Sequence, residues 1–257
     1  MISVVIPSYK DPLLAKTIQS LLDNAEGEIE IIAVLDGYWP SFDLPEDSRV
    51  HLIHLGKNGG MKNAINVGVS MARGEYIMRT DEHCMFDKGF DVKLTKRFKD
   101  NWIVYPVRYA LDTDKWEIMA DIKPNFYNKL VIDETYHKWS GVNWKERMNE
   151  RKDKEIDESM AMQGSCWIMK KSWWDKVIVA LEDRLGNHYG DSHEMVFKTW
   201  KAGGKLMVNK LTWYAHKHRD FPRTHHYGEK KARGGWDASI DEWLEYYQQV
   251  IKPKWQL

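Results

Sequence analysis

Two residues with metal-ligating side chains, Asp81 and His83, follow a short apolar run from Tyr76 to Met78. The run predicts a buried strand, because Gly74 precedes it and polar residues follow it. Residues two apart on an extended backbone project to the same side, so the carboxylate and the imidazole should converge at the strand end. Such a pair can share one divalent cation, although an ordinary polar turn has the same pattern. A cation held there could bridge two phosphates and neutralise the charge of a leaving diphosphate.

The elements that must position this pair alternate along the first half of the chain. Apolar, β-branched runs predict strands at Ile2–Pro7, Ile29–Leu35 and Val50–Leu55. Helical spacing of apolar residues predicts helices at Leu13–Asn24 and Met61–Met71. This alternation predicts an α/β fold, a nucleotide-binding sheet flanked by helices, with ligands bound beyond the carboxyl ends of the strands.

Polar residues stand where these strands end. Asp36 could accept hydrogen bonds from a ribose or a base, although a turn before a glycine also favours aspartate. The glycine-rich segment 56–60 precedes a helix, whose free N–H groups could meet a phosphate with Lys62 as a nearby cation. A flexible loop and a solvated lysine are the alternative. Asp11 predicts the N-cap of the first helix.

The second half of the chain is less regular. We expect a helix at Lys88–Lys99, a strand at Trp102–Arg108 with a hairpin partner at Trp116–Ile122, a strand at 164–169 and a helix at Lys171–Leu181. The segment Lys145–Ser159 is densely charged, which predicts either a solvated surface helix or a mobile lid.

Two further groups of polar residues accompany the last predicted elements. Asp191 opens a helix and Glu194 lies three residues on, so a capping box alone could explain both carboxylates. His216 and His218 follow a returning strand and could add a ligand to the cation, or could form a phosphate-binding edge with Arg219. A final amphipathic helix at Asp237–Val250 has a stripe that we expect to pack into the core: Ile240, Trp243, Leu244 and Tyr247.

Composition limits the class of protein. Lys plus Arg and Asp plus Glu both number 38 among 257 residues, so no overall charge favours nucleic acid. Only two cysteines occur, no apolar stretch approaches a membrane span, and the N-terminus enters a strand at once. We therefore expect a cytoplasmic protein without a membrane span. No feature indicates an oligomeric state.

The order of these motifs resembles that of GT-A glycosyltransferases, above all family 2 and the polypeptide N-acetylgalactosaminyltransferases, over roughly Ile2 to Arg219. The segment 4–9 resembles the opening strand that contacts uracil, so the resemblance implies Pro7 and Tyr9 as donor contacts. It also implies that Asp36 reads the nucleoside and that Lys62 faces the diphosphate. The Thr80–Cys84 segment resembles the family's Asp-x-His metal motif.

The resemblance extends to the acceptor side. The segment 190–204 is similar to the acceptor motif of the polypeptide-modifying enzymes, and His216 falls where their third metal ligand would be. Inverting family 2 members often carry an acidic pair at this helix start, whereas here Ser192 stands in the place of the second acid. The base could therefore be Asp191, His193 or Glu194, or the enzyme could retain configuration without a conventional base.

Together these inferences predict a transferase that moves a sugar from a nucleoside diphosphate donor, with UDP as the expected nucleotide, to a hydroxyl acceptor. Asp81, His83 and either His216 or His218 would hold Mn²⁺ or Mg²⁺, and the histidines favour Mn²⁺. We expect a domain at 1–220, with a donor half at 1–100 and an acceptor half at 101–220, and a basic loop and helix at 221–257 packed on it.

The acceptor stays open among a saccharide, a protein and DNA. The Lys217–Arg233 segment interleaves basic and aromatic residues, as a closing loop over a diphosphate or a DNA-binding surface would. A phage-type enzyme that acts on hydroxymethylated bases is therefore the specific alternative. A nucleotide-sugar-binding module without catalysis is the non-enzymatic one, which the serine at Ser192 allows.

Overall fold

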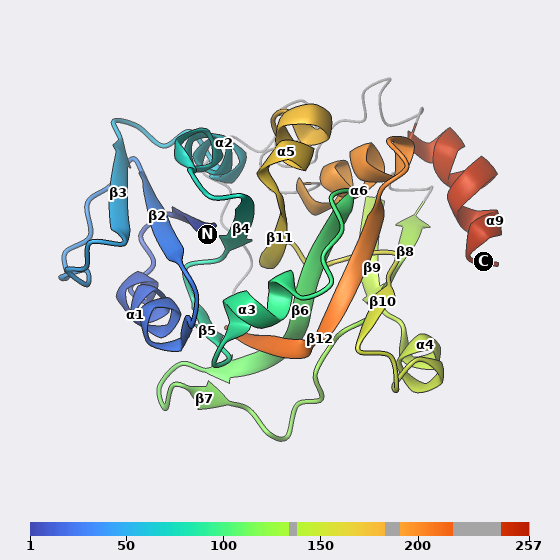
Figure 1. Cartoon of the computed structure of the whole chain (residues 1–257), viewed down its shortest axis with the longest axis horizontal. Helices are drawn as coiled ribbons and strands as arrows, with labels where there is room; N and C mark the ends of the chain where they lie inside the picture. Colours follow the sequence, from blue (N-terminus) through green and yellow to red (C-terminus); the bar gives the residue numbers. More distant parts are fainter. Residues whose placement is uncertain (134–137, 183–190, 218–242, 257) are drawn as a thin grey trace.

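The computed structural model describes residues 1–133, 138–182, 191–217 and 243–256. Over these residues, one ten-stranded sheet runs through the molecule with helices on both of its faces (Figure 1). A separate antiparallel pair, β8 (Asn128–Asp133) and β9 (Lys138–Asn143), lies beside it. The predicted α/β fold is confirmed.

The N-terminal half of the main sheet is parallel. Its order is β4 (Tyr76–Thr80), β1 (Ile2–Ser8), β2 (Ile29–Asp36) and β3 (Val50–Leu55). The chain builds outward from β1 to β3 and then crosses to β4 on the other side of β1. The carboxyl ends of β1 and β4 therefore flank the point where strand order reverses, which is where open α/β sheets bind ligands.

Strand alternation sets which helices cover which face. Val4 packs in a core with α1 (Leu14–Asn24) and α3 (Phe90–Thr95), whereas Val5 faces the opposite side with α2 (Met61–Met71). These neighbouring residues separate because successive side chains of a strand point to opposite faces. The helix predicted at 88–99 is only α3, because the chain becomes extended at the residue that follows it.

The second half of the sheet is mixed. β6 (Trp102–Asp112) pairs in parallel with β12 (Lys205–His216), and β11 (Cys166–Lys170) is antiparallel to both β4 and β6. β10 (Ile156–Glu158) pairs antiparallel with β12 at one edge of the sheet. β7 (Glu117–Ile118) pairs antiparallel with β6 and is its predicted hairpin partner. The predicted donor and acceptor halves thus share one sheet, and their division at residue 100 stays a prediction.

The helices of the second half are short, apart from α6 (Asp191–Lys201). The helix predicted at Lys171–Leu181 is instead α5 (Lys171–Trp173) followed by the π-helix η1 (Trp174–Ile178). It ends early because Val179 has a φ of 63°, a left-handed conformation that a helix cannot continue through. The charged segment 145–159 contains α4 (Lys145–Glu150), and the lid role that we considered for it stays a prediction.

The C-terminal segment packs as expected where it is described. Trp243 is buried and stacks on Phe197, and Tyr247 is buried in the same core. Leu244 is only partly buried, and Ile240 lies outside the described residues. The chain ends in η3 (Tyr247–Ile251) and α9 (Lys252–Lys254). Within the described ranges, no helix combines the length and the apolar character needed to cross a membrane.

Candidate metal and active site

A short strand brings together, beyond β4, residues that are far apart in the sequence. β5 (Cys84–Phe86) pairs antiparallel with the end of β12, so that His216 lies opposite Cys84. The backbone N–H of Lys217 donates to the carbonyl of His83 at 3.2 Å. This pairing sets His216 beside His83 although 133 residues separate them.

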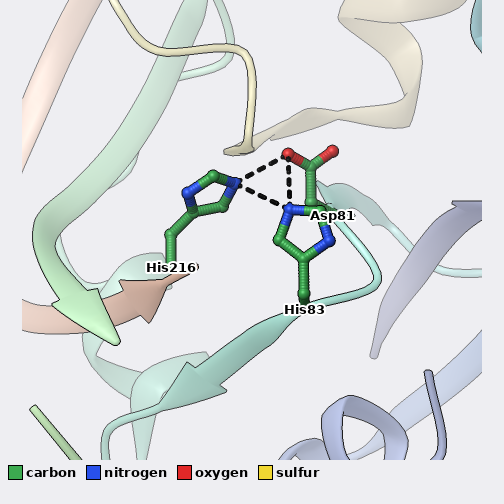
Figure 2. A group of neighbouring side chains, drawn as sticks. All are labelled: Asp81, His83 and His216. Carbon is green, nitrogen blue, oxygen red and sulfur yellow. Dashed lines mark hydrogen bonds and ion pairs between the residues drawn. The ribbon is translucent and has the colours of Figure 1, made fainter. Parts of the chain in front are cut away.

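Asp81, His83 and His216 form the cluster that we call the Asp-His-His triad (Figure 2). The two Nε2 atoms lie 3.1 Å apart, and the Asp81 Oδ2 lies 3.0 Å from the Nε2 of His216 and 3.8 Å from that of His83. One carboxylate oxygen and two imidazole nitrogens thus converge on one point, a donor set that suits a first-row transition metal. The predicted metal motif is brought together, with His216 as its third member. His218 lies outside the described residues.

The protonation of the triad can be assigned from its partners. An ionised carboxylate only accepts hydrogen bonds, so the proton between Asp81 and His216 lies on the Nε2 of His216. Burial lowers the pKa of His216 to about 4, despite the opposing effect of the Asp81 carboxylate. His216 is therefore neutral at pH 7, and its Nε2 can bind a metal once the single ring proton moves to Nδ1.

Arg79, which the sequence analysis did not select, keeps Asp81 ionised. The guanidinium is 2% exposed, and it donates to the Asp81 carboxylate and to the carbonyl of Gly164. Burial by itself would raise the pKa of Asp81, but Arg79 and the His216 hydrogen bond hold it well below its usual value. The sequence does carry a signal for this role: Arg79 directly follows apolar residues of the predicted buried strand, and a buried arginine nearly always has an acidic partner.

Asp11 and Glu82 extend the triad on the side of β1. Asp11 Oδ2 accepts from the Nδ1 of His83 at 2.9 Å, and its Oδ1 accepts from the backbone N–H of Leu13 at 2.9 Å. Because α1 begins only at Leu14, Asp11 closes the turn before the helix and is not the predicted N-cap. Glu82 accepts from the N–H of Tyr9, and burial together with the charge of Asp11 raises the pKa of Glu82 to about 8.

The predicted donor contacts Pro7 and Tyr9 lie at the carboxyl end of β1, beside the end of β4. Pro7 is buried within the strand, whereas Tyr9 is partly exposed and meets the ring of Tyr38 edge-on at 6.0 Å. Both therefore lie at the edge of the sheet that carries the triad. Arg219, the other predicted diphosphate contact, lies outside the described residues.

Asp36, predicted to contact a nucleoside, binds the glycine-rich segment whose N–H groups were expected to meet a phosphate. Its Oδ1 and Oδ2 accept from the backbone N–H groups of Gly59 and Gly60 at 2.7 and 2.9 Å, and the residue is 3% exposed. The expectation of free N–H groups for a phosphate is therefore wrong for these two glycines, because the Asp36 carboxylate already satisfies them. A contact between Asp36 and a nucleoside stays a prediction.

Lys62 and Glu194 meet in a buried cluster with Lys198, which we call the Lys-Glu-Lys cluster. Glu194 is fully buried, and its carboxylate accepts from the Nζ of Lys62 at 3.3 Å and from the Nζ of Lys198 at 2.9 Å. It also accepts from the backbone N–H of Glu182, so it does not close the predicted capping box. The structure thus pairs Lys62, 1% exposed, with an internal carboxylate and not with the triad.

Asp191 differs from Glu194, although both lie in the first turn of α6. Its Oδ2 is buried and finds no hydrogen-bond donor among the described residues. A Cβ added to Gly164 would lie 3.1 Å from that oxygen, and the Gly164 carbonyl accepts from Arg79. Asp191 is therefore adjacent to the residues that support the triad. His193 is partly exposed, and burial lowers its pKa, so its imidazole is neutral at pH 7.

Comparison of the sequence with known proteins finds glycosyltransferases among its relatives. The chain is similar to polypeptide N-acetylgalactosaminyltransferase 12 of Mus musculus, at 24% identity over 96% of the chain and 44% of that protein. It is 33% identical to "Uncharacterized glycosyltransferase EpsJ" of Bacillus subtilis over 39% of the chain and 31% of that protein. The chain spans less than half the length of the mouse relative.

A solved structure shares the fold. The crystal structure of GalNAc-T7 with UDP, GalNAc and Mn²⁺ matches 98% of this chain and 49% of that chain, with a TM-score of 0.71 and 16% sequence identity. The predicted GT-A fold is thereby confirmed. The profile of glycosyl transferase family 2 matches residues 3–177, which include β1 from its second residue, all of β2 to β4, Asp81 and His83. This chain belongs to glycosyl transferase family 2.

Proposed function

We propose that the protein transfers a sugar from a UDP-sugar to a hydroxyl acceptor with the help of a divalent cation, preferably Mn²⁺. The observation that carries the proposal is the convergence of Asp81, His83 and His216 at the end of β4. The nearest Nε2 and Oδ2 atoms lie within 3.8 Å of one another, and each imidazole is held by a partly buried carboxylate, Asp11 for His83 and Asp81 for His216. A set with two nitrogens favours Mn²⁺ over Mg²⁺, which prefers oxygen ligands throughout.

Each residue of the site has a distinct part in this proposal. A cation bound at the triad supplies positive charge that stabilises a departing diphosphate. Arg79 keeps the Asp81 carboxylate ionised for that cation, and burial keeps His216 neutral, so that its Nε2 can offer a lone pair once the ring proton moves to Nδ1. Pro7 and Tyr9 lie at the same edge of the sheet, where a nucleoside would extend from the diphosphate. Asp36 and Arg219 belong to the proposed donor site by resemblance.

Asp191 is the candidate catalytic carboxylate. Its Oδ2 has no donor among the described residues, so it can accept a hydrogen bond from a sugar or acceptor hydroxyl. Glu194 lacks this capacity because Lys62, Lys198 and a backbone N–H already occupy its oxygens. We therefore propose that Asp191 orients the reacting hydroxyl or removes its proton, with the neutral His193 as the alternative base.

The names of the relatives suggest the donor and the acceptor. The mouse relative is named for transfer of N-acetylgalactosamine to polypeptides, and the solved structure holds UDP, GalNAc and Mn²⁺. We propose UDP-GalNAc and a polypeptide hydroxyl as the pair to test first. A saccharide acceptor remains the broader alternative. The DNA alternative depends on the basic segment 217–233, of which only Lys217 is described, and nothing in the comparisons supports it.

The test is release of UDP from a panel of UDP-sugars with Mn²⁺, measured with a Ser/Thr-containing peptide, an oligosaccharide or hydroxymethylated DNA. We expect release from one donor, stimulation by the peptide and loss in chelator. Stimulation by DNA alone would replace the acceptor assignment. If no donor releases UDP although the protein binds UDP, the result would support a binding module without catalysis and contradict the proposal.

A further inference from the structure

We propose that Asp11 is a positioning residue that fixes the tautomer of His83, so that the Nε2 lone pair of His83 is available to the cation. The inference rests on the proposed metal site and deepens it. It starts from the 2.9 Å contact between Asp11 Oδ2 and the Nδ1 of His83. A histidine that binds a metal through one ring nitrogen is commonly oriented by a carboxylate that accepts from the other.

The direction of this hydrogen bond follows from the groups involved. An ionised carboxylate has no proton to give, so the Nδ1 of His83 must be the donor. A neutral imidazole carries one ring proton, and with that proton on Nδ1 the Nε2 is left with its lone pair. This Nε2 is the atom that lies 3.1 Å from the Nε2 of His216. Asp11 thus selects which nitrogen of His83 enters the triad.

The fold holds Asp11 in place for this contact. Asp11 follows β1, and His83 follows β4, and these strands are parallel neighbours whose carboxyl ends lie side by side. The Oδ1 of Asp11 accepts from the N–H of Leu13, so the turn before α1 orients the carboxylate and leaves Oδ2 directed at the imidazole. His83 itself is 2% exposed, which limits the competition of water for its Nδ1.

A different arrangement uses the same atoms. Asp11, Glu82 and His83 also offer ligand atoms within 4.8 Å of one another, and a cation among them would take the Nδ1 of His83. Asp11 would then be a ligand and not a positioning residue. Both arrangements are compatible with a proton on Nδ1 of metal-free His83, so the tautomer separates them only if that proton is absent. They also differ in which variants weaken binding of the cation.

The variants can separate orientation of His83 from the structural role of Asp11. Asp11→Ser keeps an oxygen for the N–H of Leu13 but is too short to reach His83. Asp11→Asn can keep the same turn bond while its amide N–H₂ faces Nδ1, which favours the Nε2–H tautomer and blocks the metal-binding nitrogen. Asp11→Glu retains a carboxylate and should restore part of the effect.

The first readout needs no metal and no activity. Long-range ¹H–¹⁵N spectra of the imidazole distinguish the two neutral tautomers of His83. We expect the Nδ1–H form in the wild-type protein and a larger share of the Nε2–H form in Asp11→Asn, with Asp11→Glu close to wild type. An Nε2–H tautomer in the wild-type protein, or no change in Asp11→Asn, would overturn the inference.

The second readout is the dissociation constant of Mn²⁺ by calorimetry. We expect Asp11→Ser and Asp11→Asn to weaken binding about 10- to 100-fold, with unchanged melting temperature in Asp11→Ser and with Glu82→Gln close to wild type. Equal affinity in wild type and Asp11→Ser would overturn this inference alone. No Mn²⁺ binding by the wild-type protein would overturn the proposed metal site as well. Weakening by Glu82→Gln, without any effect of His216→Ala, would assign the cation to the other arrangement.

Discussion

Two largely buried clusters of charged or ionisable residues, one at α6 and one at the end of β4, have their hydrogen-bonding needs met in opposite ways. In the Lys-Glu-Lys cluster, two ammonium groups and a backbone N–H surround the Glu194 carboxylate, so the cluster needs no ligand. In the Asp-His-His triad, three atoms that are good metal ligands converge with one ring proton among them. The difference teaches that the partners of a carboxylate, more than its place in a motif, separate a structural acid from a functional one.

The largest effect should follow removal of a triad ligand. His216→Ala is the cleanest variant, because Asp81→Ala would leave the buried Arg79 without its carboxylate and destabilise the fold. We expect His216→Ala to lower Mn²⁺-dependent transfer by about 100-fold or more and to leave the melting temperature nearly unchanged. Steady-state kinetics with a UDP-sugar and thermal unfolding measure the two quantities. Retained activity would show that His216 is not a ligand.

The next effect compares the two acids of α6 directly. Asp191→Asn should lower kcat by about 10- to 100-fold because it removes the carboxylate that is open to a hydroxyl. Glu194→Gln, the comparison variant in the same helical turn, should keep the kcat of the folded enzyme within about threefold, since Glu194 contacts two lysines and not the triad, although loss of its charge should lower stability. Kinetics of both variants at saturating donor decide between them. A larger loss in Glu194→Gln would reverse our assignment.

Lys62→Met should act on stability. Lys62 is 1% exposed, and its loss would leave the Glu194 carboxylate with Lys198 as its only charged partner among the described residues. We expect a loss of about 2–4 kcal/mol in the free energy of unfolding by urea, with part of it recovered in the double variant Lys62→Met/Glu194→Gln. A weakened affinity for UDP with unchanged stability would instead support the predicted contact between Lys62 and the diphosphate.

The smallest effect concerns a third paired carboxylate, distant in sequence from both clusters. Asp157 accepts hydrogen bonds from Arg151, Arg147 and Tyr127. Burial by itself would raise the pKa of Asp157, but these partners lower it to about 2. A lowered pKa gives stability that is complete above the unfolded value near 4 and is lost as pH falls towards 2. We expect Asp157→Asn to cost about 1–2 kcal/mol at pH 7 after allowance for solvent screening. Urea unfolding at pH 7 and pH 3 should show the difference between the two proteins shrinking at the lower pH.

The residues that could be predicted from the sequence are those whose position depends on local pattern. The strands before Asp36 and Asp81 followed from apolar runs, and the two-residue spacing of Asp81 and His83 placed both side chains together. The pattern after a returning strand left His216 and His218 both open as the third ligand, and the family resemblance favoured His216. The positions of the strands and of the paired side chains could be predicted because a strand's period and its polar end are properties of a few neighbouring residues, whereas their role as metal ligands stays a prediction.

The remaining features depend on contacts between distant segments. Lys62 and Glu194 are 132 residues apart, and nothing near either residue indicates that they meet. The bond from Asp11 to His83 spans 72 residues, and the local pattern at Asp11 matched an N-cap equally well. The antiparallel pairing of β5 with β12, which sets His216 beside His83, joins a three-residue strand to a bulged one, a signal too short for a pattern to reveal.

The measurement that tests the central claim most directly is a titration of the metal-free protein with Mn²⁺, in which electron paramagnetic resonance measures the concentration of free ion. We predict one site in the wild-type protein, the same site in Glu194→Gln, and its loss in His216→Ala. Equal binding by wild type and His216→Ala, or no binding by the wild-type protein, would contradict the assignment of the triad as the cation site.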